Sequence, residues 1–136
     1  MDEHRIRLRG GWECQSTSSA GEPPERITLP VRWDPGNPRR LRLTRRFGRP
    51  PVDLERQTLL LELAQARGIH SLLLNGKAQS GVSASKSYYL IPLAEIDERN
   101  TLVLEVETAE SAVGAGEGVQ DWGQIAILVR SIDFPP

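Results

Sequence analysis

Apolar residues alternate with polar ones along much of this chain, and glycine and proline interrupt the alternation at short intervals. The 136 residues include 12 glycines and 10 prolines. A period of two places alternate side chains on opposite faces of an extended strand, whereas a helix needs a period of about 3.6. In residues 100–106, Leu102, Leu104 and Val106 share one face in this way. We therefore expect an all-β protein.

Asn75-Gly76 is the strongest turn signal in the chain. It directly follows the apolar run at residues 71–74. Asn and Gly both tolerate positive φ, which a two-residue hairpin loop needs in order to match the strand twist. We expect a hairpin here that returns the chain through Lys77 to Gln79.

Other segments complete the prediction. The runs at 57–64 and 69–74 are so continuously apolar that we expect central strands covered on both faces. Pro30 marks the segment at 26–31 as an edge or a strand end. We expect a single helical turn near 94–96 and a glycine-rich loop at 110–121. Together these segments predict one domain spanning residues 1–136, an antiparallel two-sheet sandwich of eight or nine strands.

Composition excludes several classes of protein. The formal net charge is −1, so no overall field would gather nucleic acid or an anionic membrane. No apolar run approaches the roughly 20 residues of a membrane-spanning helix. The charged amino terminus lacks a signal region, which indicates a cytoplasmic protein unless a signal peptide has been removed. Cys14 is the only cysteine, and we interpret it as a small buried hydrophobe.

The order of the segments resembles the amino-terminal sugar-binding domain of family 2 glycoside hydrolases, the β-galactosidase and β-glucuronidase group. That family has a strand leading to a "VNG" hairpin, then a "D-I-T-x-L-L" turn and an "N-x-L-x-V-x-V" strand. The corresponding residues here are 74–76, 92–96 and 100–106, and the resemblance also includes "LRGGWE", "LTRRFGRP" and "WGQIAILVR". It implies a galactose-binding-domain-like jelly roll. The family's catalytic glutamates lie on a later (β/α)₈ barrel, for which this sequence has no room, so the resemblance transfers no catalytic residue.

The residues themselves also predict no enzyme. No nucleophile motif such as G-x-S-x-G occurs, and His4 and His70 are the only histidines. With one cysteine and two distant histidines there is no zinc spacing, and we expect no metal or other cofactor. The loop carboxylates Glu110, Glu117 and Asp121 are of the type that binds structural calcium, but they form no ordered ligand pattern.

Two functions remain. The first is a non-catalytic module that binds carbohydrate or places a carbohydrate-active partner, with the ligand at aromatic and polar side chains near the loops. The residues chosen for this site are Trp122, Asp121, Gln120, Trp33 and Tyr88. The second is a protein-interaction or scaffolding sandwich, which would self-associate or bind another chain. It is suggested by the few aromatic residues, 5% of the chain, and by the arginines between Arg39 and Arg49, which we interpret as a solvated strand face or an ion-paired docking surface.

Overall fold

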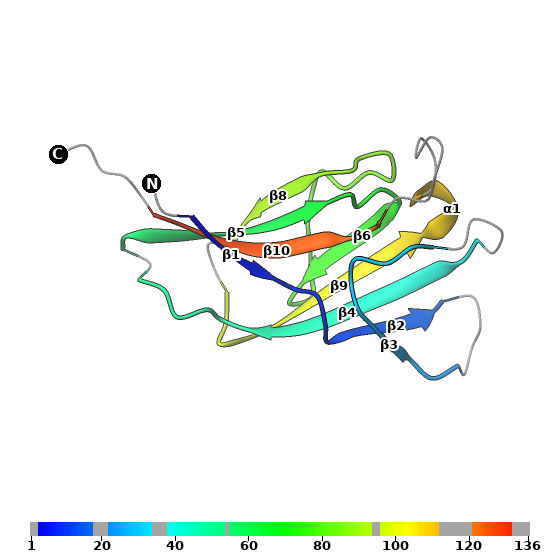
Figure 1. Cartoon of the computed structure of the whole chain (residues 1–136), viewed down its shortest axis with the longest axis horizontal. Helices are drawn as coiled ribbons and strands as arrows, with labels where there is room; N and C mark the ends of the chain where they lie inside the picture. The colour runs from blue at the N-terminus through cyan, green and yellow to red at the C-terminus, as the bar shows by residue number, and fades with distance from the viewer. Residues whose placement is uncertain are drawn as a thin grey trace.

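Two antiparallel sheets face each other in the computed structural model of this chain (Figure 1). The structure describes residues 3–17, 22–33, 38–53, 55–93, 96–111 and 121–131. The four-stranded sheet has the order β1 (Glu3–Arg7), β10 (Gln124–Ser131), β5 (Gln57–Ala64) and β8 (Tyr89–Pro92). The six-stranded sheet has the order β3 (Glu25–Ile27), β2 (Trp12–Ser16), β4 (Arg40–Gly48), β9 (Arg99–Glu107), β6 (Ile69–Leu74) and β7 (Lys77–Ala78). The predicted two-sheet sandwich is confirmed, with ten strands in the described residues instead of eight or nine.

Alternation along the strands builds the core between the sheets. In β4, Leu41 and Leu43 are 1% and 0% exposed, while Arg42 between them is exposed. The partner strand β9 repeats the pattern, and Leu43 lies opposite Leu104 in the register. Each fully buried leucine contributes about 1.5–3 kcal/mol relative to an exposed one. The alternating pattern of the sequence therefore specifies which face of each strand the other sheet covers.

The expectation that two strands are covered on both faces is wrong for β5 and β6. In these strands buried leucines alternate with partly exposed residues, such as Leu60 in β5 and Leu73 in β6. The strand buried on both sides is β10, in which Ala126 and Leu128 are 4% and 0% exposed although they alternate with the core residues. β10 lies between β1 and β5, so side chains from both neighbours can cover its outer face.

The Asn75-Gly76 hairpin is confirmed. Asn75 has φ 53° and Gly76 has φ 79°, the positive values that a two-residue turn with the strand twist requires. The turn joins β6 to β7 with Leu74 opposite Lys77. β7 has only two residues, and β3 at the far edge of the same sheet has three.

Some local predictions need revision. Residues 94 and 95, at the expected helical turn, lie outside the described residues, and the helical turn that the structure describes is α1 (Thr108–Ser111). α1 extends into the segment that we predicted to be a glycine-rich loop, the rest of which is mostly outside the described residues. β3 is an edge strand, as Pro30 suggested. No helix in the described part of the chain is long and apolar enough to cross a membrane.

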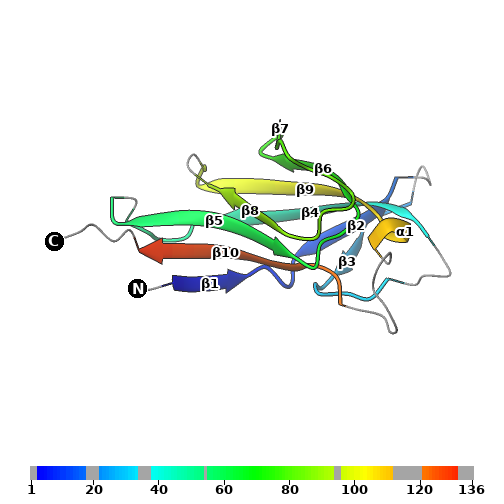
Figure 2. The same ribbon diagram turned by 90° about the horizontal axis from the view of Figure 1, so that it is seen from above.

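Figure 2 shows β1 and β3 on the same side of the sandwich. The short crossover at residues 8–11 joins β1 in the smaller sheet to β2 in the larger one. Trp12, at the end of this crossover, is 0% exposed and its indole N–H donates to the Leu8 carbonyl at 2.7 Å. Trp12 therefore anchors the crossover in the core.

Candidate functional site

A corner of the sandwich is formed where the segment after β3 meets the segment before β10. Val31 and Trp122 exchange two backbone hydrogen bonds, of 2.9 Å and 2.7 Å. This bridge brings Trp33 to Trp122, with ring centroids 5.6 Å apart and the ring planes at 51°. Aromatic pairs favour tilted arrangements at such distances. The structure therefore joins two of the aromatic residues that the sequence suggested.

Trp122 is the inner member of this pair. Its side chain is 3% exposed, and its indole N–H donates to the Arg67 carbonyl at 2.8 Å. A buried indole with a satisfied N–H is a packing residue, so Trp122 supports its neighbour and offers little surface of its own to a ligand.

Trp33 is only partly buried and is therefore the outer member of the pair. Its indole nitrogen is buried and has no hydrogen-bond partner within the described residues. The polar part of the corner is an ion pair, in which Arg32 Nε lies 3.0 Å from Asp121 Oδ1, with both side chains well exposed. We call Arg32, Trp33, Asp121 and Trp122 the tryptophan corner. Gln120, also predicted for this site, lies outside the described residues.

Gly123 fixes the path of the chain behind the tryptophan corner. Its φ is +89°, and a Cβ at this position would lie 3.2 Å from a methyl group of Leu29. Its backbone N–H donates to the Gln65 carbonyl at 2.9 Å. Only glycine combines this backbone conformation with so close a contact.

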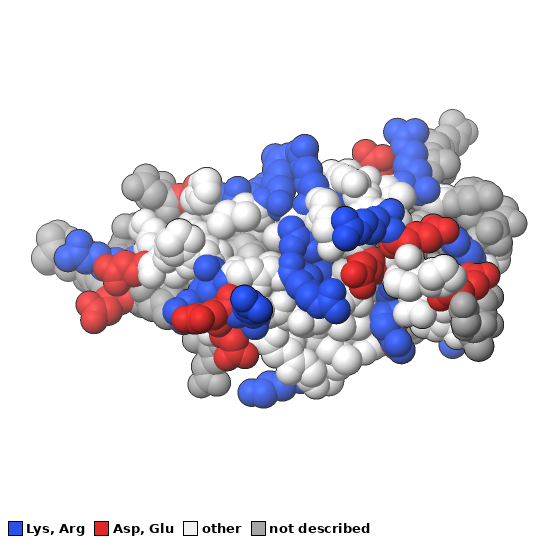
Figure 3. Space-filling view, turned by 90° about the horizontal axis from the view of Figure 1, so that it is seen from below, with Lys and Arg blue, Asp and Glu red and all other residues white. Residues whose placement is uncertain are grey.

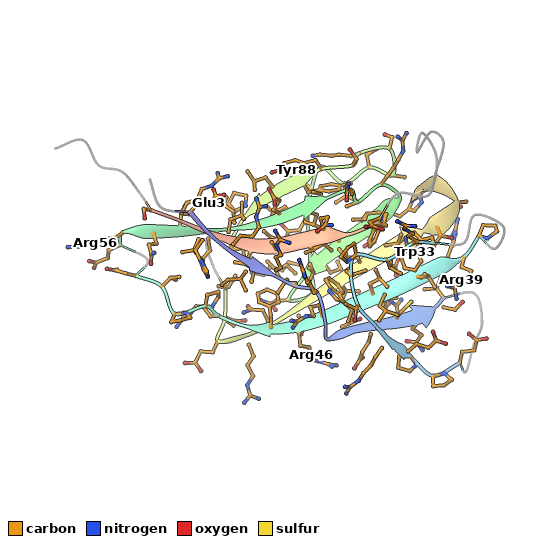
Figure 4. All side chains as sticks on the ribbon, viewed as in Figure 1. Glu3, Trp33, Arg39, Arg46, Arg56 and Tyr88 are labelled. Atoms are coloured by element: carbon orange, nitrogen blue, oxygen red, sulfur yellow. The ribbon has the colours of Figure 1, made fainter. Side chains whose placement is uncertain are left out.

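Tyr88 does not belong to the tryptophan corner. Figure 4 shows Tyr88 beside β8, and Trp33 lies apart from it, farther to the right in the view. The Tyr88 hydroxyl donates to Glu62 at 2.8 Å, and the other oxygen of Glu62 lies 3.2 Å from Arg5. The hydrogen bond to the Glu62 carboxylate raises the pKa of Tyr88, because the bond is lost when the phenol ionises. Sequence spacing gave no signal for this cluster, since its members come from β1, β5 and the segment before β8.

The arginine-bearing face of β4 is ion-paired. Its cross-strand pairs are Arg40 with Glu107, Arg42 with Glu105 and Arg46 with Glu13, at 3.5, 3.1 and 3.5 Å. Figure 3, seen from the side where β2 and β4 lie in Figure 1, shows basic and acidic side chains interspersed. Exposed pairs of this kind contribute about 0–1 kcal/mol each. The ion pairing that we considered for these arginines is therefore present, and docking stays a prediction.

Two shallow hollows occur elsewhere in the described residues. One, of about 210 Å³, lies on the arginine-bearing face and is lined by Thr17, Arg40, Arg42, His70, Glu105 and Val106. The other, of about 480 Å³, is formed by the β4–β5 connection and is lined by Arg49, Pro50, Pro51, Val52, Asp53 and Glu98. Neither contains an aromatic side chain, so neither offers a ring on which a sugar could stack.

No group of three or more His, Cys, Asp or Glu residues in the described ranges is arranged to hold a metal ion. Of the three loop carboxylates considered for calcium, Asp121 is paired with Arg32. Glu117 and the side chain of Glu110 lie outside the described residues. The calcium suggestion therefore gains no support from the geometry of Asp121.

No family model and no curated protein matches this chain. Solved structures do match. An FMN-binding β-glucuronidase from Facaelibacterium prausnitzii L2-6 has a TM-score of 0.72 at 17% identity, over 93% of this chain and 22% of that one. A Bifidobacterium dentium β-glucuronidase complexed with coumarin-3-O-glucuronide has a TM-score of 0.65 at 12% identity, over 96% and 30%. A family 2 β-galacturonidase from Eisenbergiella tayi, bound to galacturonate, has a TM-score of 0.65 at 15% identity, over 93% and 24%.

These similarities establish the fold. This chain has a galactose-binding-domain-like β-sandwich fold that family 2 glycoside hydrolases share, as the sequence resemblance implied. It spans only 22–30% of the length of the three enzymes. The described residues form two sheets and one helical turn, and they contain no (β/α)₈ barrel.

Proposed function

We propose that this chain is a non-catalytic carbohydrate-binding or accessory module, and that a saccharide meets it at the tryptophan corner. The fold shared with enzymes that act on sugars supports this class of function. Fold alone does not determine function, so the proposal rests on the corner itself.

The observation that carries the proposal is the partly exposed Trp33 held beside the exposed Arg32–Asp121 pair. A sugar ring has an apolar face that packs on an indole, and its hydroxyls bond to charged planar groups such as guanidinium and carboxylate. Trp122 fixes the ring of Trp33, which lowers the entropy that binding would cost.

Uronates are the first ligands to test. Two of the similar enzymes have structures with a glucuronide or a galacturonate bound. Arg32 offers a planar donor group that suits a sugar carboxylate, because guanidinium and carboxylate can form two parallel hydrogen bonds. A uronate would compete with Asp121 for this group.

Titration calorimetry with glucuronate, galacturonate and their neutral counterparts tests the proposal. We expect Trp33→Ala to abolish binding and Asp121→Asn to change the preference between charged and neutral sugars. Tyr88→Phe is the matched control, since it alters an exposed aromatic residue outside the corner. A folded protein that binds none of these sugars at millimolar concentration, or that binds equally well after Trp33→Ala, contradicts the proposal.

A protein-interaction or scaffolding role is the second candidate. It is favoured by Tyr88 and Leu90, which are 45% and 39% exposed and are the large hydrophobic residues most exposed within the described part. Tyrosine on a surface of this kind is common at interfaces. Sedimentation of the intact chain would show an oligomer that Leu90→Lys dissociates, and a strict monomer with no captured partner would leave this role unsupported.

A further inference from the structure

The outer edge of β1 has no neighbouring strand in the described structure, since β1 pairs only with β10. The Leu8 N–H donates to the Ile125 carbonyl at 2.9 Å, which sets the phase of this ladder. In an antiparallel pair alternate residues exchange both hydrogen bonds. Ile6 and Leu8 therefore direct their backbone groups toward β10. Arg5 and Arg7 direct theirs to the free edge.

A second free edge lies on the same side of the sandwich. β2 pairs with β4 from Leu41 to Arg45 and then ends, because Gly11, with φ +76°, turns the chain into the crossover to β1. The rest of β4 has β9 on one side only. The phase of the β2–β4 ladder directs the Arg46 carbonyl to the empty side, and Arg45 Nη1 donates to it. In the described residues, backbone hydrogen bonds therefore do not join β1 to the end of β4.

Arg45 lies at this unpaired end of β4. It alternates with Leu43 and Phe47 on the core side of β4, and its guanidinium lies against Gly11, where a Cβ would be 3.1 Å from Nε. The Nε atom is buried without a hydrogen-bond partner, and Arg45 forms no ion pair among the described residues. Burial lowers the pKa of Arg45. A buried polar atom is normally hydrogen-bonded, so the Nε atom of this partly buried arginine lacks its usual partner.

The outer face of the β1 edge is also basic. Arg7 and Arg9 are exposed, and neither forms an ion pair within the described ranges. Figure 3 shows basic side chains gathered from the upper edge toward the middle of the view. The whole chain carries a formal net charge of −1, so this positive charge is a local excess.

We propose that β1 accepts an extended acidic segment of a partner polypeptide as an added strand. The free backbone groups of Arg5 and Arg7 pair with its main chain, as in other cases of strand addition. Its side chains alternate between the two faces, so carboxylates on one face meet Arg7 and a carboxylate on the other reaches Arg45. A second copy of this chain fits less well, since the one carboxylate in its own β1, Glu3, already pairs with Arg130.

The same charges protect the edge against unspecific pairing. Edge strands commonly use exposed or inward-pointing charges to prevent aggregation. A positive edge repels basic strands and attracts acidic ones. The charges that prevent aggregation therefore also select for an acidic partner strand. This proposal does not depend on sugar binding.

A fluorescein-labelled peptide that alternates glutamate and valine is the probe, and its lysine–valine counterpart is the control. We expect the intact chain to bind the glutamate peptide in an anisotropy titration, more weakly as salt is raised, and not to bind the lysine peptide. Arg7→Gln and Arg45→Met should each weaken binding by about tenfold. Arg56→Gln is the matched control, because Arg56 is exposed in the β4–β5 connection and forms no described ion pair.

Arg7→Pro separates strand addition from simple charge attraction. It removes the same charge as Arg7→Gln and also removes an N–H that faces the free edge, without breaking the ladder to β10. We expect Arg7→Pro to bind at least about tenfold more weakly than Arg7→Gln. A second measurement uses the unaltered chain. Amide hydrogen exchange at Arg5 should slow when the glutamate peptide is added.

Three results would overturn the proposal. Equal binding by Arg7→Pro and Arg7→Gln, with no slowing of exchange at Arg5, would show a basic patch without an added strand. If the folded chain does not bind the glutamate peptide at millimolar concentration, an acidic segment is excluded as the ligand of β1. A dimer that Arg7→Pro dissociates would show that a second copy occupies the edge. Melting temperatures establish that each variant is folded.

Discussion

Asn75 and Asn100 are joined by a hydrogen bond between their side chains, in which Asn75 Nδ2 donates to Asn100 Oδ1 at 2.9 Å. The side-chain oxygen of Asn75, Oδ1, also accepts from the Thr101 N–H at 2.8 Å. The asparagine of the hairpin turn thus holds the first residues of β9. Two motifs that lie far apart in the sequence, and that both contribute to the family resemblance, form one structural unit.

Replacement of Asn100 should therefore destabilise the fold strongly. Its side chain is 2% exposed, accepts from the Asp97 N–H at 2.9 Å and donates to the Asp97 carbonyl at 2.9 Å. Asn100→Ala removes all of these part-buried hydrogen bonds and leaves a gap in the core, so we expect a loss of about 3 kcal/mol in the free energy of unfolding. Urea unfolding measures it. Gln15→Ala, which alters an exposed amide, is the control, and equal losses in the two variants would refute the assignment.

Gly76 and Gly10 provide a matched test of backbone strain in the turn. A Cβ would meet nothing within 4 Å at either position, but only Gly76 has a positive φ, of +79°. Gly76→Ala should cost about 1–2 kcal/mol of unfolding free energy through backbone strain alone. Gly10→Ala should be nearly neutral. Thermal unfolding measures the loss of stability in each variant. Equal losses in the two variants would mean that the hairpin does not depend on the positive φ of Gly76.

Tyr88 should titrate above the usual tyrosine range. The neutral phenol donates to Glu62, and ionisation would break this bond and place two negative charges together, so the pKa of Tyr88 is raised. The contribution to stability is complete below about pH 10, the value for an unfolded chain, and is lost as the pH rises through the higher folded pKa. Ring signals of carbon-labelled tyrosine, assigned with Tyr88→Phe, follow the titration. Glu62→Gln should lower the midpoint, and an unchanged midpoint would exclude Glu62 as the cause.

Cys14 should be unreactive in the folded chain. The thiol is buried among core residues at 7% exposure, and burial raises its pKa, an effect that Arg39 partly offsets. Only the thiolate attacks disulfide reagents, so both access and ionisation are reduced. Ellman's reagent should react slowly in buffer and rapidly in urea. A fast reaction without denaturant would mean that the edge near β2 opens readily.

The parts of the fold that the sequence predicted correctly depend on local chemistry. The Asn75-Gly76 turn needs only two residues that accept positive φ, and the strands around Leu43 and Leu104 need only alternation. The burial of Cys14 and Trp12 follows from side-chain chemistry in the same way. Each of these signals is contained within a few neighbouring residues.

The errors concern properties that depend on neighbours distant in sequence. Leu60 and Leu73 look as apolar as Leu128 and, like it, lie between two flanking strands, but only Leu128 is fully covered on the outer face of its sheet. At the candidate site, Trp33 and Trp122 are equivalent as sequence features. Their different exposure results from the Val31–Trp122 bridge, which local spacing does not encode. Local spacing likewise does not encode the separation of Tyr88 from the two tryptophans.

The position of β10 has a consequence for how this chain is made. β1 contains residues 3–7, yet its only partner strand among the described residues contains residues 124–131. During synthesis, β1 and the edge of β5 that faces it remain unpaired until β10 emerges from the ribosome, after nearly all of the described residues. The smaller sheet must therefore assemble late, and a nascent chain stalled before residue 124 would display unpaired apolar strands to the chaperones of the cell.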